Sequence, residues 1–288
     1  TIIDMGNDPY NRKPEEVMTG FMGAGGWSDG KLTYHTSIGG HMSKYCGDER
    51  AMELMDEVIT NFKRFHPKPE EVQCSNPIAE PDFIKPYFGL RLFPVWHVGT
   101  DYLHEIGKNW YDFLVDKGIK FVWNTKVTEV DFDNNTASTV HAVFPYDRLI
   151  FAVGKSGIDF GKYLIEENEQ PTEPKPVQIG VRFEAPQKHF QKLIDVSYDF
   201  KLYRKFEDKG VSLRSFCTNN NAAYVALEET YGDYSYNGHA KKDESYRNDM
   251  TNFGILMEVR GIDKPFDWSR ELVSKVNKTD IILTISLN

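Results

Sequence analysis

The chain has 288 residues, of which 40% are hydrophobic and 14% aromatic, enough to bury the core of one large domain or two ordinary ones. Its 34 basic and 43 acidic residues give a net charge of −9, which argues against a nucleic-acid partner and against an anionic membrane surface. Three widely spaced cysteines and no apolar run of membrane-spanning length favour a soluble protein of a reducing, cytoplasmic compartment without disulfides.

The first residues of the chain, 1–6, are predicted to form a buried strand with Asp4 at its carboxyl end. A carboxylate in that position can accept hydrogen bonds from the ribose hydroxyls of an adenine dinucleotide, although it can equally be an ordinary strand-end residue. In the dinucleotide-binding fingerprint the glycines precede the acidic residue by about 20 positions. Here the GxG at 23–25 follows Asp4, so either the role of Asp4 is coincidental or a fingerprint lies upstream of Thr1.

Residues 20–32 form the most glycine-rich segment, with glycine at five of thirteen positions. A backbone without side chains can approach a large anionic ligand closely and point its N–H groups at phosphates. The alternative is a mobile surface loop, and spacing alone does not separate the two interpretations.

Two helices and several strands are predicted after this segment. Apolar residues at helical spacing predict one helix over residues 48–65, and a second runs from the N-cap pair Thr100-Asp101 to Gly118. Alternating patterns then predict strands over residues 119–131, 140–144 and 149–153, the last ending at Gly154. This order is typical of a nucleotide-binding α/β domain with a β-excursion.

From about residue 160 the sequence changes character. Short β-like runs follow at residues 177–184, 211–217, 224–228 and 252–259, with helical patterns near 186–195 and 266–276. We therefore expect two domains: a nucleotide-binding domain over residues 1–160 and an α+β domain with a mainly antiparallel sheet over residues 161–288.

Candidate catalytic residues are few. The eight histidines form no HxxxH or HxH pair, so no metal site is expected, and neither a GxSxG elbow nor a Walker phosphate loop is present. Cys217 and His239 could serve as a thiol and a general acid or base, although a lone cysteine on an apolar strand is more often buried packing.

Several segments in order resemble a family of uncharacterised FAD-dependent dehydrogenases, within the class of flavoproteins with two dinucleotide-binding domains. The segment Gly23–Leu32 is similar to the family's GAG-(A/T)-F-S-D-G-K-L signature, and His97–Asp101 resembles its H-x-G-T-D segment. The later matches are Phe151–Asp159, Lys175–Glu184, Ser215–Cys217 and Asn237–His239. Met22 and Lys155 depart from the pattern, which usually has glycine and histidine there.

The resemblance implies an FAD/NAD(P)-binding, Rossmann-like domain that holds FAD non-covalently and lacks its first strand and helix in this chain. Asp4 would bind the adenosine ribose and Val127 would lie by the adenine, with Arg12 as a weaker match in the loop after Asp4. Residues of the glycine-rich segment would line the pyrophosphate and flavin, and two residues at the end of the predicted strand 149–153 would lie alongside the dinucleotide. These residues are Gly23, Ala24, Gly25, Gly26, Ser28, Asp29, Gly30 and Lys31, and then Ala152 and Gly154.

The resulting hypothesis is an oxidoreductase that transfers a hydride through FAD, from a small-molecule substrate or from NAD(P)H. A cationic Lys31 near the flavin ring could stabilise the anionic reduced form. The family's closing C-terminal Gly-Asp segment has no match, so the chain resembles a family member truncated at both ends. The alternative hypothesis is a non-catalytic binding or structural module with a flavoprotein-like fold.

Overall fold

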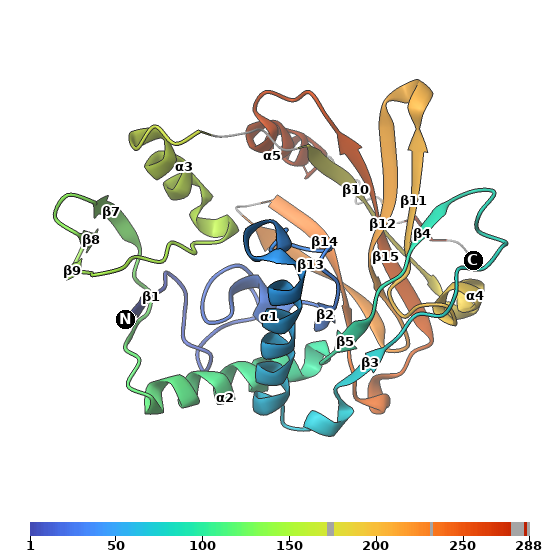
Figure 1. The fold of residues 1–288 in the computed structure, drawn as a ribbon, viewed down its shortest axis with the longest axis horizontal. Helices are drawn as coiled ribbons and strands as arrows, with labels where there is room; N and C mark the ends of the chain where they lie inside the picture. The colour runs from blue at the N-terminus through green and yellow to red at the C-terminus, as the bar shows by residue number, and fades with distance from the viewer. Residues whose placement is uncertain (172–175, 231–232, 278–284, 287–288) are drawn as a thin grey trace. The chain divides into compact units, whose positions relative to one another are not determined.

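The structure, a computed structural model, describes residues 1–171, 176–230, 233–277 and 285–286. These residues contain five α-helices and several sheets, most of them antiparallel (Figure 1). The chain divides into two compact units, which we call unit 1 (Thr1–Trp27 and Gly107–Glu173) and unit 2 (Ser28–Ile106 and Pro174–Asn288). Each unit thus combines two separate stretches of chain, whereas the sequence suggests one boundary at residue 160. Lys175, in one of the family-like segments, lies outside the described residues.

Unit 1 contains the strand expected before Asp4. This strand, β1 (Ile2–Ile3), pairs in parallel with β6 (Phe121–Val122), and the backbone N–H of Asp4 continues the ladder by donating to the carbonyl of Val122 at 2.9 Å. Beside this pair the unit has a three-stranded antiparallel sheet, formed by β7 (Val127–Asp131), β8 (Thr136–Thr139) and β9 (Val143–Pro145). This antiparallel sheet is the expected β-excursion, but two parallel strands alone do not make a Rossmann-like sheet.

Aromatic rings form the packing centre of unit 1. Phe121 stacks on Trp123 with ring centroids 5.2 Å apart, and Tyr111 of helix α2 (Leu103–Asp116) packs edge-on against Phe121 at 4.9 Å. Phe21, from the start of the glycine-rich segment, contacts the same rings at 5.8 to 6.4 Å. This cluster anchors one end of the segment beside β6.

The strand predicted over residues 149–153 is absent. These residues are not paired with any described strand, and their apolar side chains are exposed, with Ile150 88% accessible and Phe151 42%. A strand requires a neighbouring ladder for its N–H and C=O groups, and the sequence pattern does not say whether one is present. The segment leads through Gly154 into α3 (Ile158–Glu167).

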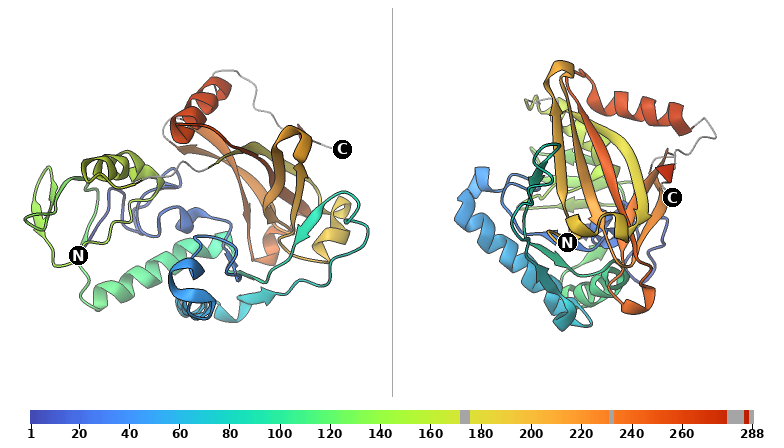
Figure 2. Two further views of the ribbon diagram at one scale, coloured as in Figure 1. Left: turned by 45° about the horizontal axis from the view of Figure 1, so that its top comes forward. Right: turned by 90° about the vertical axis from the view of Figure 1, so that its right-hand side faces the viewer.

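Unit 2 is built on a six-stranded sheet with the order β16-β10-β15-β12-β11-β4. Its long antiparallel strands lie side by side in both views of Figure 2. The strands are β4 (Gly89–Arg91), β10 (Val177–Pro186), β11 (Lys201–Phe206), β12 (Val211–Asn219), β15 (Met250–Val259) and β16 (Ile285–Ser286). The mainly antiparallel sheet predicted for the second half of the chain is confirmed, with β4 added from the first half.

One face of this sheet carries the apolar core of unit 2. Phe183, Phe200 and Phe253 are buried. The ring centroid of Phe253 lies 5.2 Å from that of Phe183 and 5.5 Å from that of Phe200. Phe190, at the start of the short helix α4 (Gln191–Ile194), packs edge-on against Phe253 at 5.3 Å. The alternation of side chains along β10 and β15 sends their other side chains to the opposite face, where the polar residues lie.

Smaller elements complete unit 2. One is a hairpin of two strands, β13 (Ala223–Thr230) and β14 (Asp233–Ala240). The other is a three-stranded sheet in the order β2 (Lys31–Thr33), β5 (Val95–His97) and β3 (Gln73–Ser75). Helix α1 (Ser43–Phe65) is interrupted at Gly47, where φ is 81°, so its regular part begins near the predicted residue 48. Helix α5 (Pro265–Asn277) contacts β10 and β14. None of the helices in the described part of the chain combines the length and the apolar character that a membrane span requires.

Candidate functional site

Asp4 organises the chain around the carboxyl end of β1. Its Oδ1 atom accepts hydrogen bonds from the backbone N–H groups of Gly6, at 2.7 Å, and Gly20, at 2.9 Å. A Cβ on Gly6 would lie 2.2 Å from the nitrogen of Gly20, so only glycine allows the two loops to meet here. Both bonds use the same oxygen, which leaves Oδ2 of the half-buried carboxylate for further donors.

The glycine-rich segment continues from this contact into a 3₁₀ turn, Gly23–Trp27. Met22 and Gly23 both have left-handed backbones, with φ of 68° and 52°. A Cβ built on Gly23 or Gly25 meets no atom within 4 Å, so the backbone faces open space at these two positions. Gly26 is different, because it packs on the guanidinium of Arg12 and a Cβ there would lie 2.6 Å from Nη1.

Arg12 is the anchor of the glycine-rich segment. Its buried guanidinium donates to the carbonyls of Glu16, Val17, Phe21 and Gly23, the last two at 2.6 Å. Burial lowers its pKa to about 10. Because its donors are used by the backbone, Arg12 shapes the loop and has little left for a ligand phosphate.

The remaining candidate cofactor-binding residues of unit 1 are Val127, Ala152 and Gly154. The backbone N–H of Thr125 donates to the carbonyl of Asp4 at 2.9 Å, which brings the start of β7, and hence Val127, to the end of β1. Ala152 and Gly154 are exposed, and the hydroxyl of Ser156 donates to the carbonyl of Met18 at 3.3 Å. The loop after Gly154 therefore approaches the segment that precedes the glycines.

The other half of the family-like signature, residues 28–31, belongs to unit 2 and lies in a buried charge cluster. The Lys31 ammonium is 3.0 Å from Oδ2 of Asp29 and 3.4 Å from Oδ2 of Asp199, and it also donates to the carbonyl of Thr218. Burial alone would lower the pKa of Lys31, but Asp199 and Asp29 raise it above its usual value. All three N–H groups of Lys31 thus have partners within unit 2.

Asp29 connects this cluster to Cys217. The Cys217 thiol lies 2.8 Å from Oδ2 of Asp29, and its backbone is left-handed, with φ of 52°, where β12 has a bulge between Phe216 and Asn219. Burial and the neighbouring carboxylate raise the pKa of the thiol. Burial would also raise the pKa of Asp29, but the charge of Lys31 and the hydrogen bond from Cys217 outweigh it and lower this pKa to about 2. The thiol is therefore the donor and the carboxylate the acceptor.

His97 supports the same cluster. Its Nε2 lies 3.1 Å from the carbonyl oxygen of Asp29, and its ring lies 5.2 Å from that of Tyr198. Burial lowers the pKa of His97 to about 4, with a further contribution from the charge of Lys242. The imidazole is therefore neutral at physiological pH and donates to Asp29.

His239, on β14, contacts the signature residue Ser28 but pairs with a different carboxylate, Glu228. Its Nε2 is 2.9 Å from Oε1 of Glu228 and its Nδ1 is 3.2 Å from the carbonyl oxygen of Ser28, while its ring stacks on Tyr224 at 5.1 Å. The link to Cys217 is indirect: the thiol lies 3.9 Å from the carbonyl of Gly238, the preceding residue. The two candidate catalytic side chains are thus both in unit 2, but each is bound to its own carboxylate.

Gly30 closes the signature by a backbone contact. Its carbonyl accepts from the N–H of Val98 at 2.8 Å, and a Cβ at Gly30 would lie 2.7 Å from the backbone of Gly99. The hydroxyl of Thr100 donates to the carbonyl of Ser28 at 3.0 Å and accepts from the N–H of Ala240 at 3.3 Å, so Thr100 does not cap helix α2 as the sequence suggests. The two family-like segments at 23–32 and 97–101 therefore meet in unit 2 through residues 28–30 and 98–100.

Several buried or half-buried polar residues of this cluster have no counterpart among the sequence candidates. Arg182 donates to Asn252 and to the carbonyl of Cys217, and Asp199 accepts from Lys201 and from the N–H of Thr218. The sequence feature that could have indicated this cluster is asparagine in or next to apolar strand patterns, because such polar residues are seldom buried without partners. These residues are Asn219, Asn220 and Asn252, all at most 1% exposed. Among the described residues no group of three or more His, Cys, Asp or Glu side chains is arranged to hold a metal ion.

Comparison with known proteins gives no assignment: no protein-family model matches the chain, and no curated protein matches it.

Proposed function

We propose that the protein is a flavoprotein in which unit 1 holds FAD, and that it acts as an FAD-dependent oxidoreductase. The observation that carries this proposal is the position of Asp4. Its carboxylate stands at the carboxyl end of a strand in a parallel pair, and two glycine N–H groups fix one oxygen while the other remains for ribose hydroxyls.

The glycine loop fits the same ligand. Gly23 and Gly25 face open space, so a pyrophosphate can approach their backbone without meeting a Cβ. Arg12 supports the proposal indirectly, because its bonds to Phe21 and Gly23 hold the loop in one conformation before a ligand arrives. Val127 begins the strand next to the end of β1 and fits a backbone contact to the adenine.

Bound FAD would supply hydride transfer, and the residues of the chain would bind, orient and shield it. Asp4 would orient the adenosine half, and the glycine loop would bind the phosphates. In unit 2, Asp29, Lys31 and Asp199 fix one another, so Lys31 has a structural role and is not a free cation for a flavin ring. His239 and Cys217 remain candidates for proton transfer to a small-molecule substrate, and NAD(P)H remains a proposed electron donor.

A binding series tests the assignment of Asp4. We expect FAD and ADP to bind the wild-type chain and FMN, which lacks the adenosine, to bind weakly. Asp4→Asn keeps an oxygen for Gly6 and Gly20 but removes the charge, and we expect it to weaken FAD and ADP about tenfold or more, since a hydrogen bond to a charged group contributes about 1.5–3 kcal/mol.

Asp133→Asn is the matched control, because Asp133 is an exposed carboxylate in the β7–β8 turn of the same unit. Equal affinity of wild type and Asp4→Asn for FAD would refute the role of Asp4. No uptake of FAD by the wild-type chain would instead favour the non-catalytic module.

A further inference from the structure

A second feature of unit 2 lies on its large sheet, outside the buried cluster. In register, Tyr203 of β11 stands opposite Arg214 of β12 and opposite Gly89 of β4, and Lys201 stands opposite Arg91. Directly opposed residues, and residues two apart on one strand, share a face of the sheet. Arg91, Lys201, Tyr203, Arg214 and Phe216 therefore form one continuous strip, which we call the basic–aromatic strip.

The two arginines of the strip carry positive charge that no described carboxylate pairs with. Arg214 donates to the side-chain oxygen of Gln178, and neither Arg91 nor Arg214 forms an ion pair among the described residues, whereas Lys201 is paired with Asp199 at 2.9 Å. Burial and the nearby charge of Arg91 lower the pKa of Arg214, while the charge of Glu258 raises it. Two neighbouring cations in a protein of net charge −9 make a local site of attraction for an anion.

The aromatic rings of the strip are partly open and lie among these cations. Tyr203 is 38% exposed, with Cζ of Arg91 5.4 Å from its ring centroid. Phe216 is 41% exposed, and both Cζ of Arg214 and Nζ of Lys201 lie 5.4 Å from its ring centroid. Gly89 allows the Tyr203 ring to lie over β4, since a Cβ there would be 2.2 Å from the ring. Exposed rings flanked by arginine are suited to stack a planar base.

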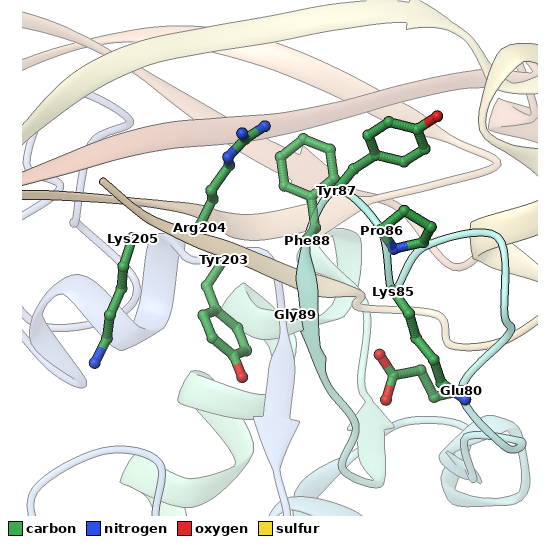
Figure 3. A pocket seen from close by; sticks show the side chains of 9 residues that line it. All are labelled: Glu80, Lys85, Pro86, Tyr87, Phe88, Gly89, Tyr203, Arg204 and Lys205. Carbon is green, nitrogen blue, oxygen red and sulfur yellow. The ribbon is translucent and has the colours of Figure 1, made fainter. Parts of the chain in front are cut away.

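A hollow adjoins the strip at Tyr203. Its volume is about 450 Å³, within the range of small-ligand sites. Figure 3 shows Tyr203 and Lys205 pointing to one side of β11 and Arg204 to the other. The remaining lining residues are Glu80, Lys85, Pro86, Tyr87, Phe88 and Gly89. The hollow thus extends the same combination of cations and rings beyond the sheet edge.

We propose that the basic–aromatic strip binds a nucleotide, with its phosphates on Arg91 and Arg214 and its base against Tyr203 or Phe216. The net charge of −9 favours a small phosphate ester over a nucleic-acid strand, because a long polyanion would also meet the acidic remainder of the surface. This site lies entirely in unit 2 and does not depend on the flavin proposal.

The test is ADP titration by calorimetry of the full chain carrying Asp4→Asn, so that the adenosine site proposed in unit 1 is weakened. We expect ADP to bind, and Arg214→Gln or Arg91→Gln added to this background to weaken binding about tenfold or more. Arg247→Gln is the control, because Arg247 is an exposed arginine paired with Asp249 and Glu244, and it should leave the affinity unchanged. Circular dichroism of each variant checks that it is folded.

Two further probes identify the ligand class. We expect Tyr203→Ala together with Phe216→Ala to weaken ADP but not inorganic pyrophosphate, since only ADP has a base to stack. Equal loss or no loss for both probes would overturn the assignment of the base. An oligothymidylate that binds more tightly than ADP would replace the nucleotide by a nucleic-acid strand. Complete loss of ADP binding with Asp4→Asn alone would overturn the strip while leaving the flavin proposal intact.

Discussion

The Sγ atom of Cys217 lies 2.8 Å from Oδ2 of Asp29, although 188 positions separate the two residues in the chain. This bond joins the family-like glycine-rich signature to the bulge of β12 and carries the thiol into a buried charge cluster with Lys31 and Asp199. The pair makes Cys217 a donor to a carboxylate instead of an exposed nucleophile.

Thiol reactivity follows from this contact. We expect Cys46, which is exposed, to react with a maleimide at least about a hundredfold faster than Cys217, which is half-buried, bonded to Asp29 and has a raised pKa. Mass spectrometry of peptides after timed labelling measures both rates in one sample. Equal rates in the folded protein would show that Cys217 is accessible and that the contact with Asp29 does not persist.

Lys31 should be important for stability. Lys31→Met leaves the buried Asp29 without a cation and Asp199 with Lys201 alone, so we expect the free energy of unfolding to fall by about 3–5 kcal/mol in urea titrations. The control is Lys85→Met, which removes an exposed ion pair with Asp82 and should have little effect. A loss for Lys31→Met no larger than that for Lys85→Met would contradict the buried cluster.

His97 predicts a pH dependence. Burial lowers its pKa from 6.5 to about 4, so the unfolded chain binds the proton more readily. The stability linked to this group is fully present above pH 6.5 and is lost as the pH falls through 4, with a magnitude of roughly 3 kcal/mol. His97→Gln keeps a donor for Asp29 and does not titrate, so its unfolding free energy should fall less than that of wild type between pH 7 and 4.

His35→Gln, at an exposed histidine, is the control for this measurement and should follow wild type. Identical pH profiles for wild type and His97→Gln would show that His97 is protonated as easily in the folded protein as in the unfolded one.

Alanine substitutions at Gly30 and Gly39 distinguish the cost of backbone strain from the cost of close packing. Both have left-handed backbones, with φ of 69° and 96°, but a Cβ at Gly39 meets no atom, whereas one at Gly30 would lie 2.7 Å from the backbone of Gly99. We expect Gly39→Ala to cost about 1 kcal/mol and Gly30→Ala about 1–3 kcal/mol more, in thermal or urea unfolding. Equal costs would indicate that the backbone of Gly99 is not in contact with Gly30.

Helices α1, α2 and α5 and four strands of unit 2, β10, β12, β13 and β15, could be predicted from the sequence, because their signals are local. Helix α1 follows from apolar residues at helical spacing, and α2 ends at Asp116, two residues before the left-handed Gly118 with φ of 81°. Residues 149–153 have an equally clear apolar pattern but no paired strand, since pairing depends on a neighbour that the pattern does not specify.

The charge cluster could not be predicted in the same way. Its contacts join Asp29 and Lys31 to Asp199 and Cys217, residues from distant parts of the chain. The sequence shows Lys31 as a cation beside glycines, and only the folded structure shows that its three N–H groups are used within the protein. The same applies to Arg12, whose guanidinium binds backbone carbonyls instead of remaining available to a ligand.

Flavin binding is the central claim, and the most direct measurement is the visible absorption spectrum of the purified chain after incubation with FAD and gel filtration. The proposal predicts a yellow protein with about one flavin per chain, released on denaturation and reduced in amount by Asp4→Asn. A colourless wild-type protein, with all of the flavin eluting separately, would contradict it.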